Sequence, residues 1–98
     1  MVIYKYPVDL IFGEVQEIAL PVGAVPLSAG EQRGSIVLWV MVDPEALETK
    51  CLAFVIMPTG YAEVPEGFDA SDFLGTCQMP SGLVAHVLLK GGRNSVHS

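Results

Sequence analysis

The segment Thr59-Gly60-Tyr61 combines three residue types that together could bind a ligand. A threonine hydroxyl can hydrogen-bond a ligand, a glycine lets the backbone approach it, and a tyrosine ring offers a face for stacking. These are the parts of a nucleobase or phosphate pocket. The segment also opens the longest irregular stretch of the chain, Pro58 to Asp72, and long loops are often binding elements. An ordinary turn that needs glycine for its conformation is the alternative interpretation.

An anionic ligand would need a positive charge, and this chain offers few. Its five basic residues include Arg33, expected at a hairpin tip, and Lys50, expected at the start of a strand. One or two such cations together with backbone N–H groups are enough to hold a small anion. We therefore take Arg33 and Lys50 as the candidate phosphate partners, with solvated surface charges as the alternative.

A hydrolytic triad is not supported by the histidines. His86 stands within the apolar stretch Leu83–Leu89, which is typical of a structural or half-exposed histidine. Ser81, His86 and Asp72 could be combined into a triad on paper, but no nucleophile-elbow motif marks a reactive serine. His97, near the end of the chain, is expected to have no role. We expect no catalytic residue and no enzymatic activity.

Four acidic residues fall in the irregular stretch: Glu63, Glu66, Asp69 and Asp72. Neighbouring carboxylates can perform acid–base chemistry or bind a cation. Their spacing matches no calcium loop, and a solvated polar loop is the simpler interpretation.

The two cysteines, Cys51 and Cys77, do not form a zinc motif with nearby histidines. Each is flanked by strand-like sequence, so both are expected to be buried, reduced thiols. No metal and no cofactor is predicted.

The composition favours self-association. Of 98 residues, 51% are hydrophobic and only 16% are charged, against about 25% charged in a typical domain. A domain of this size buries roughly two thirds of its surface, so apolar side chains should remain outside the core. We expect one β domain over residues 1–90 that forms a homo-oligomer, followed by a flexible tail over residues 91–98.

The net charge of −6 argues against a broad surface for long nucleic acids, which requires clustered lysines and arginines. The first residues do not resemble a secretion signal. The longest apolar run, Ile36 to Val42, is too short to span a membrane. A cytoplasmic protein without membrane contact is therefore expected.

The apolar pattern predicts an all-β fold with about seven strands. Turn residues recur every eight to twelve residues or so, which is typical of a sandwich or barrel. Asp43-Pro44-Glu45-Ala46 favours one short helical turn, after which a strand over Lys50–Met57 should pair with the strand over Ser35–Val42. We expect a compact antiparallel sandwich or open barrel. The predicted strands are Val2–Val8, Val15–Leu20, Ala24–Glu31, Ser35–Val42, Lys50–Met57, Phe73–Gln78 and Leu83–Leu89.

Several segments together resemble a family of small phage-encoded proteins with no established activity, over roughly residues 2 to 90. The stretch from Leu38 to Ala46 is the most specific of them, and the family usually has His-Pro where this chain has Tyr61-Ala62. The segments are Tyr4-Lys5-Tyr6, Leu20-Pro21-Val22-Gly23-Ala24 with Leu27-Ser28, Leu38–Ala46, Thr59-Gly60, Leu74-Gly75-Thr76-Cys77-Gln78 and Leu83-Val84-Ala85-His86-Val87.

The resemblance implies a small phage protein that acts in the cytosol of the host cell by binding. One class of such proteins forms oligomers that sequester cyclic-nucleotide signals made by bacterial defence enzymes. We therefore expect an oligomeric, non-enzymatic sponge for a small anionic nucleotide, with Thr59, Gly60, Tyr61, Lys50 and Arg33 as its site. A protein–protein interaction module acting on a host or virion protein is the alternative, and an enzyme that degrades a signal is a third, less favoured one.

Overall fold

A computed structural model describes residues 1–91, and Arg93, His97 and most of the predicted tail lie outside the described residues. Seven strands and a single 3₁₀ turn account for its regular structure, which confirms the predicted β fold. No helix within the described residues is long and apolar enough to cross a lipid bilayer. The elements are β1 (Val2–Val8), β2 (Gln16–Pro21), β3 (Val25–Gln32), β4 (Ser35–Val42), β5 (Thr49–Pro58), η1 (Ala70–Asp72), β6 (Phe73–Gln78) and β7 (Val84–Leu89).

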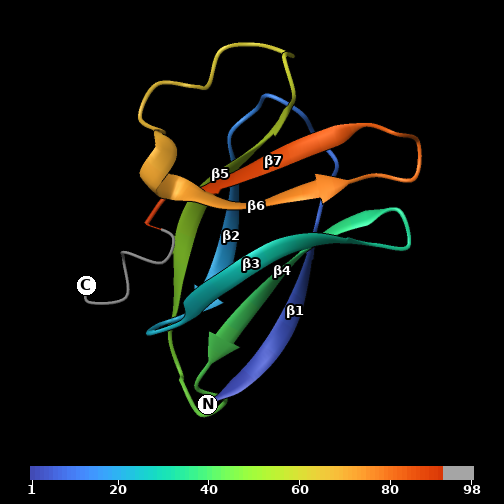
Figure 1. The fold of residues 1–98 in the computed structure, drawn as a ribbon. Coiled ribbons are helices and arrows are strands. Elements are labelled where there is room, and N and C mark those ends of the chain that lie inside the picture. The colour runs from blue at the N-terminus through green and yellow to red at the C-terminus, as the bar shows by residue number, and fades with distance from the viewer. Residues whose placement is uncertain (92–98) are drawn as a thin grey trace.

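The strands form two antiparallel sheets that face each other (Figure 1). Sheet A has the order β1-β4-β3, and sheet B has the order β2-β5-β7-β6. Every strand pair within the two sheets is antiparallel. The two sheets do not close into a barrel, so the sandwich alternative of the sequence prediction is the one observed.

The core lies between the sheets and follows the alternation of side chains along each strand. On β4, Ile36, Leu38 and Val40 point inward and are fully buried. Phe54 and Ile56 of β5 face them from sheet B. Full burial of one such side chain contributes about 1.5–3 kcal/mol, so this alternation fixes the register of the central strands.

The sandwich is closed along one side, where β3 packs against β6. A Cβ atom built on Gly75 of β6 would lie only 2.7 Å from the backbone oxygen of Ala29 on β3. Real Cβ atoms essentially never come so near a backbone atom, so this approach of the two backbones depends on glycine.

The sandwich is open along the other side, between β1 and β2. A hollow of about 150 Å³ separates these strands, lined by Val8, Ile18 and Phe54 among others. We call this gap the open seam.

The expected position of Arg33 at a hairpin tip is confirmed. Arg33 and Gly34 form the two-residue loop between β3 and β4, both with positive φ (52° and 85°), which is typical of tight hairpins. Ile18 and Leu20 of β2 face the core, and Glu17 faces water.

Other local expectations are wrong. Asp43–Ala46 is a turn closed by an Ala46 N–H to Asp43 C=O hydrogen bond of 3.1 Å, and the one helical turn is η1. β5 does not pair with β4, because the connection between them crosses from one sheet to the other. Cys51 is exposed, since it lies on the outer face of sheet B, whereas Cys77 is buried as expected.

Candidate functional site

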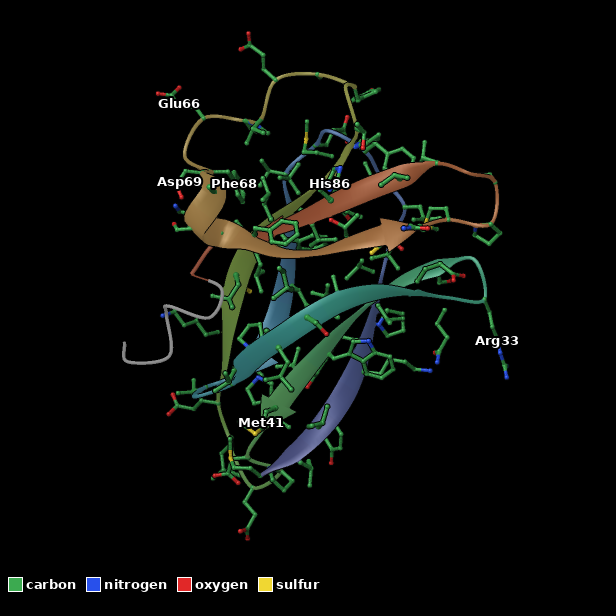
Figure 2. All side chains as sticks on the ribbon, in the orientation of Figure 1. Arg33, Met41, Glu66, Phe68, Asp69 and His86 are labelled. Atoms are coloured by element: carbon green, nitrogen blue, oxygen red, sulfur yellow. The ribbon has the colours of Figure 1, made fainter. Side chains whose placement is uncertain are left out.

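His86 lies in the middle of β7, with its side chain on the outer face of sheet B (Figure 2). β7 is flanked by β5 and β6, and the strand register places Met57 and Thr76 directly opposite His86 on these two neighbours. Ala85 and Val87, on either side of His86, point into the core. The alternation of β7 therefore forces the histidine outward, where it is half-buried.

Thr59 reaches His86 because the chain continues the sheet for one residue after β5 ends. Its backbone N–H donates to the Val84 carbonyl at 3.0 Å. This bond positions the Thr59 hydroxyl 2.8 Å from His86 Nε2. On the other side of the ring, the Thr76 hydroxyl lies 3.0 Å from His86 Nδ1. Both ring nitrogens are thus hydrogen-bonded, each to a threonine hydroxyl, and we call the three residues the His86 cluster.

The hydrogen bonds within the cluster indicate where the ring proton lies. The Thr59 hydroxyl is also 3.4 Å from the Val84 carbonyl, which can only accept. If Thr59 donates to that carbonyl, His86 Nε2 must carry the proton and donate to Thr59. Nδ1 then accepts from the Thr76 hydroxyl. A protonated imidazolium could donate to both hydroxyls, so the same geometry accommodates either charge state.

The loop after Thr59 covers the apolar half of the same face. Phe68 packs on a small cluster formed by Val55, Met57 and Leu88, all of which point away from the main core. The His86 cluster lies beside this covered patch, and its two threonines are exposed. The outer face of sheet B is therefore part apolar and covered, part polar and accessible.

The acidic end of this loop has a structural role. Asp69 and Asp72 form a capping box around η1, with the Asp69 N–H donating to the Asp72 carboxylate at 3.0 Å. Asp72 is buried, and its carboxylate is 3.4 Å from the Lys90 ammonium. Hydrogen bonds from the Ser71 hydroxyl and N–H hold the pKa of Asp69 below its usual value. These contacts anchor the loop to β7.

Tyr61 is 60% exposed, and its ring lies against Gly13 of the loop between β1 and β2. A Cβ atom on Gly13 would be 2.8 Å from the Tyr61 ring. Gly60 has φ of 72° and open space around it, so its glycine serves the turn that the Tyr61 N–H closes onto the Pro58 carbonyl. The loop that follows Thr59 therefore exposes the Tyr61 ring beside the β1–β2 loop.

The structure does not bring the predicted cations to this segment. Lys50 lies at the opposite end of β5, nine residues before Thr59, which corresponds to about 30 Å of extended strand. Arg33 lies on the hairpin tip of sheet A and points away from the molecule (Figure 2). Of the five predicted binding residues, Thr59, Gly60 and Tyr61 stay together, and Lys50 and Arg33 are separate from them and from each other.

Sequence reasoning missed the partnership of Thr59 with His86 and Thr76. His86 was expected to be a structural or half-exposed histidine without a site of its own, and Thr76 was not singled out as a binding residue. The signal lay in the segments that carry the family resemblance, because Thr59, Thr76 and His86 each belong to one of them. The fold brings these three segments together around one imidazole ring.

These features define a two-sheet β sandwich that carries an exposed, hydrogen-bonded polar cluster on one outer face. The chain matches the family model described as "Domain of unknown function (DUF7352)" over residues 1–96, and it belongs to that family. No curated protein matches the chain. No solved structure matches it either.

Proposed function

We propose that this protein is a non-enzymatic binding protein whose ligand site is the His86 cluster. The observation that supports this proposal most is the convergence of Thr59, Thr76 and His86 from three separate segments onto one exposed face. Hydroxyls and an imidazole offer both donors and acceptors to a polar ligand. The Tyr61 ring, on the same loop as Thr59, supplies an aromatic surface.

Binding suits this geometry better than catalysis. A threonine hydroxyl that is hydrogen-bonded to an imidazole resembles the nucleophile and general base of a hydrolytic enzyme. In a working triad, however, the far side of the ring is held by a carboxylate, which stabilises the imidazolium that forms. Here the far nitrogen, Nδ1, meets the neutral Thr76 hydroxyl. A neutral partner stabilises the positive charge much less, so proton abstraction from Thr59 would be weakly supported.

The finer proposal follows from the resemblance: a phage-encoded sponge that sequesters cyclic-nucleotide defence signals in the host cytosol. Thr59, His86 and Thr76 would hold the polar edge of a base, and Tyr61 would stack on it. Phosphates require cations, and the loop that borders the site carries Glu63, Glu66 and Asp69 instead. Lys50 or Arg33 could therefore serve such a site only from a neighbouring subunit of an oligomer.

Thermal denaturation with a panel of cyclic di- and trinucleotides tests the proposal. A ligand that binds only the folded protein raises its stability by RT ln(1 + [L]/Kd), so the shift should grow with ligand concentration. His86→Ala, Thr59→Val and Thr76→Val should remove the shift. Thr49→Val, at the far end of β5, is the matched control and should keep it. The recovered nucleotide should be chemically unchanged.

A panel without any shift would end the nucleotide proposal. A shift that survives all three cluster variants would place the ligand elsewhere. A nucleotide that is consumed would show an enzyme.

A second candidate, the protein-interaction module, is favoured by the outer face of sheet A. The residues exposed or partly exposed on this face include Ile3, Trp39 and Met41, and Lys5 is the only charged residue that the three strands place there. Glu31 is the only acid within the three strands of sheet A, and it pairs with the inward-facing Ile36. An apolar face without acids on a protein of net charge −6 is the expected form of a protein-binding surface.

This candidate predicts one host or virion protein that is retained by the wild type and by Thr59→Val. Met41→Lys should lose it, because a charge would enter the apolar face. Retention by Met41→Lys would exclude sheet A as the binding surface.

A further inference from the structure

Strand β1 has a free edge. It pairs with β4 on one side, and no strand of the described residues pairs with its other side. The residues at its beginning are apolar and exposed: Met1 is 67% exposed, Val2 37%, Ile3 60% and Tyr4 48%. An unpaired apolar edge of this kind is a template for another strand.

The first half of β1 lacks the residues that usually prevent an edge strand from pairing with another chain. A lysine on an edge strand ordinarily discourages pairing. The Lys5 ammonium instead lies 2.5 Å from the Gln32 side-chain oxygen on β3, so it reaches across β4 and away from the free edge. Pro7, which has no N–H, protects only the far end of β1.

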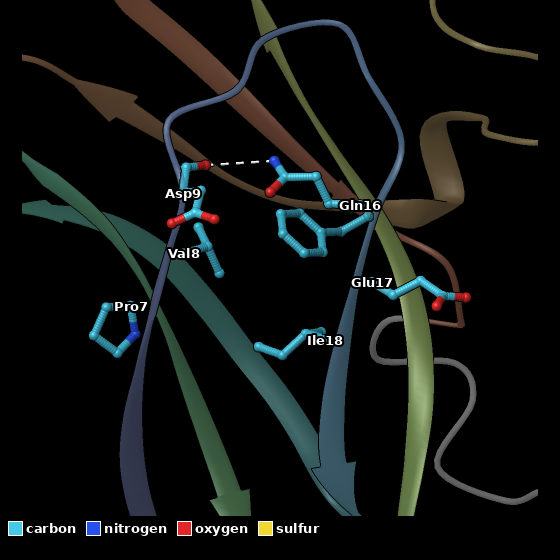
Figure 3. Close-up of a pocket in the computed structure, with 7 residues that line it drawn as sticks. Pro7, Val8, Asp9, Gln16, Glu17 and Ile18 are labelled. Atoms are coloured by element: carbon cyan, nitrogen blue, oxygen red, sulfur yellow. Dashed lines mark hydrogen bonds between the residues drawn. The ribbon is translucent and has the colours of Figure 1, made fainter.

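The same edge borders the open seam (Figure 3). Val2 and Tyr4 have the inward orientation of the core residues Val42 and Val40 that they pair with, yet both remain exposed. At one end of the seam, the Gln16 amide bridges β2 to the loop after β1 through the carbonyls of Asp9 (3.4 Å) and Ile11 (3.3 Å). The rest of the seam leaves inward-facing apolar side chains of sheet A without cover.

We infer that two copies of this chain dimerise by antiparallel pairing of β1 with β1 of the second copy. The two copies of sheet A then form one continuous six-stranded sheet. Residues opposite each other in an antiparallel pair point to the same face. Val2, Tyr4 and Tyr6 of both copies would therefore point toward the two sheets B, and the two open seams would share one apolar interior.

Charge favours the β1 edge over the β2 edge as the place where a second copy binds. Each copy carries a net charge of −6, so two copies repel each other over most of their surface. The segment Met1–Val8 contains no acid, and its only charged side chain, Lys5, is held away from the edge. The β2 edge, by contrast, has Glu17 exposed beside it.

The surface area that this edge can bury is small for a specific protein–protein interface. A strand of seven residues is about 24 Å long, and two packed sheets with their side chains are roughly 20 Å thick. The edge can therefore bury roughly 500 Å² per copy, or roughly 1,000 Å² in total, which is at the lower limit for specific interfaces. We expect a reversible dimer that dissociates on dilution, independent of any ligand at the His86 cluster.

Sedimentation velocity of the wild-type chain over a wide concentration range should show a monomer–dimer equilibrium. Tyr4→Lys should raise the dimer dissociation constant roughly a hundredfold, because each dimer would then hold two new charges in its shared apolar interior. Ile3→Lys should also weaken the dimer, because it adds a lysine of each copy to the outer face of the paired edges. Phe73→Lys is the matched control: Phe73 is 47% exposed on β6, at the closed side of the sandwich and away from β1, so its substitution should leave the equilibrium unchanged.

Hydrogen exchange locates the interface and shows whether the variants fold. The amides of Val2–Tyr6 should exchange more slowly at high than at low protein concentration, and the β4 and β7 amides of both lysine variants should remain protected. A wild-type chain that stays monomeric at the highest concentration would overturn the inference. So would a dimer that persists in both lysine variants, or one whose β1 amides exchange at the same rate at every concentration.

Discussion

The Thr59 hydroxyl and the His86 Nε2 atom are 2.8 Å apart, although 27 residues separate them in the sequence. The contact depends on one backbone hydrogen bond, from Thr59 N–H to the Val84 carbonyl, which prolongs the β5–β7 ladder beyond Pro58. If β5 were one residue longer or shorter, Thr59 would no longer lie beside His86. The end of a strand therefore sets the geometry of the site as much as the side chains do.

The first prediction concerns the tautomer of His86. Because Thr59 can donate to the Val84 carbonyl, neutral His86 should carry its proton on Nε2 and accept at Nδ1 from Thr76. Long-range ¹H–¹⁵N NMR distinguishes the two nitrogens by their chemical shifts. Thr76→Val should shift the Nδ1 resonance most, since only that nitrogen loses its donor. A wild-type spectrum with the proton on Nδ1 would reverse the assigned direction of both hydrogen bonds.

The strands were predictable, and the site was only partly so. Alternation identified β1 and β2, because a two-residue period follows from one-sided burial. β4 was identified instead as a continuous apolar run, Ile36 to Val42, which does not show which of its faces is inward. The pairing of β5 was not predictable, since the short connection Asp43–Glu48 passes between sheets as easily as it would close a hairpin. His86 and Thr76 belong to one hairpin, but Thr59 meets them only through this non-local pairing. The residues around Thr59 do not indicate that β5 pairs with β7.

The second prediction concerns the two thiols. Burial raises the pKa of the Cys77 thiol, and the nearby Glu31 carboxylate raises it further. The thiolate is the reactive form, so native Cys77 should resist a thiol reagent at pH 8. Cys51 is exposed and should react. One thiol per chain should be labelled in the native protein and two after denaturation, and Cys51→Ser should abolish native labelling. Rapid labelling of native Cys51→Ser would mean that Cys77 opens to solvent.

The third prediction concerns the acid stability of η1. The Ser71 hydroxyl, and after it the Ser71 N–H, lower the pKa of Asp69 from its ordinary value of 3.8. A lowered pKa in the folded state stabilises the fold at pH values above 3.8, and this stabilisation is lost as the pH falls through the folded-state value. Wild type should therefore be more stable than Asp69→Asn at pH 6, and the difference should shrink steadily toward pH 2.5 in urea denaturation.

Ser71→Ala provides the control for the cause of that shift. It removes the hydroxyl donor, so the Asp69 carboxyl should titrate nearer to 3.8 when followed by NMR. An unchanged Asp69 midpoint in Ser71→Ala would assign the lowered pKa to another group.

The fourth prediction compares two glycines on facing strands of the closed side of the sandwich. A Cβ atom on Gly75 would lie 2.7 Å from the Ala29 oxygen and 3.0 Å from the Ala29 nitrogen, both backbone atoms that cannot rotate away. Gly75→Ala should therefore separate β3 from β6 and destabilise the fold by up to about 3 kcal/mol. A Cβ atom on Gly30 of β3 would meet only the Trp39 indole nitrogen at an ordinary 3.6 Å. Gly30→Ala should leave stability within about 1 kcal/mol of wild type, on the stabilising side, because alanine loses less backbone entropy on folding.

Both variants can be measured by chemical denaturation with Trp39, the single tryptophan of the chain, as the fluorescent reporter. The slope of the transition should stay the same in Gly30→Ala, and only its midpoint should move. Equal costs for the two substitutions would mean that the β3–β6 approach is loose enough to admit a methyl group. In that case the close approach of β3 and β6 would not require glycine at position 75. Side-chain packing alone would then explain why this side of the sandwich is closed and the seam between β1 and β2 is open.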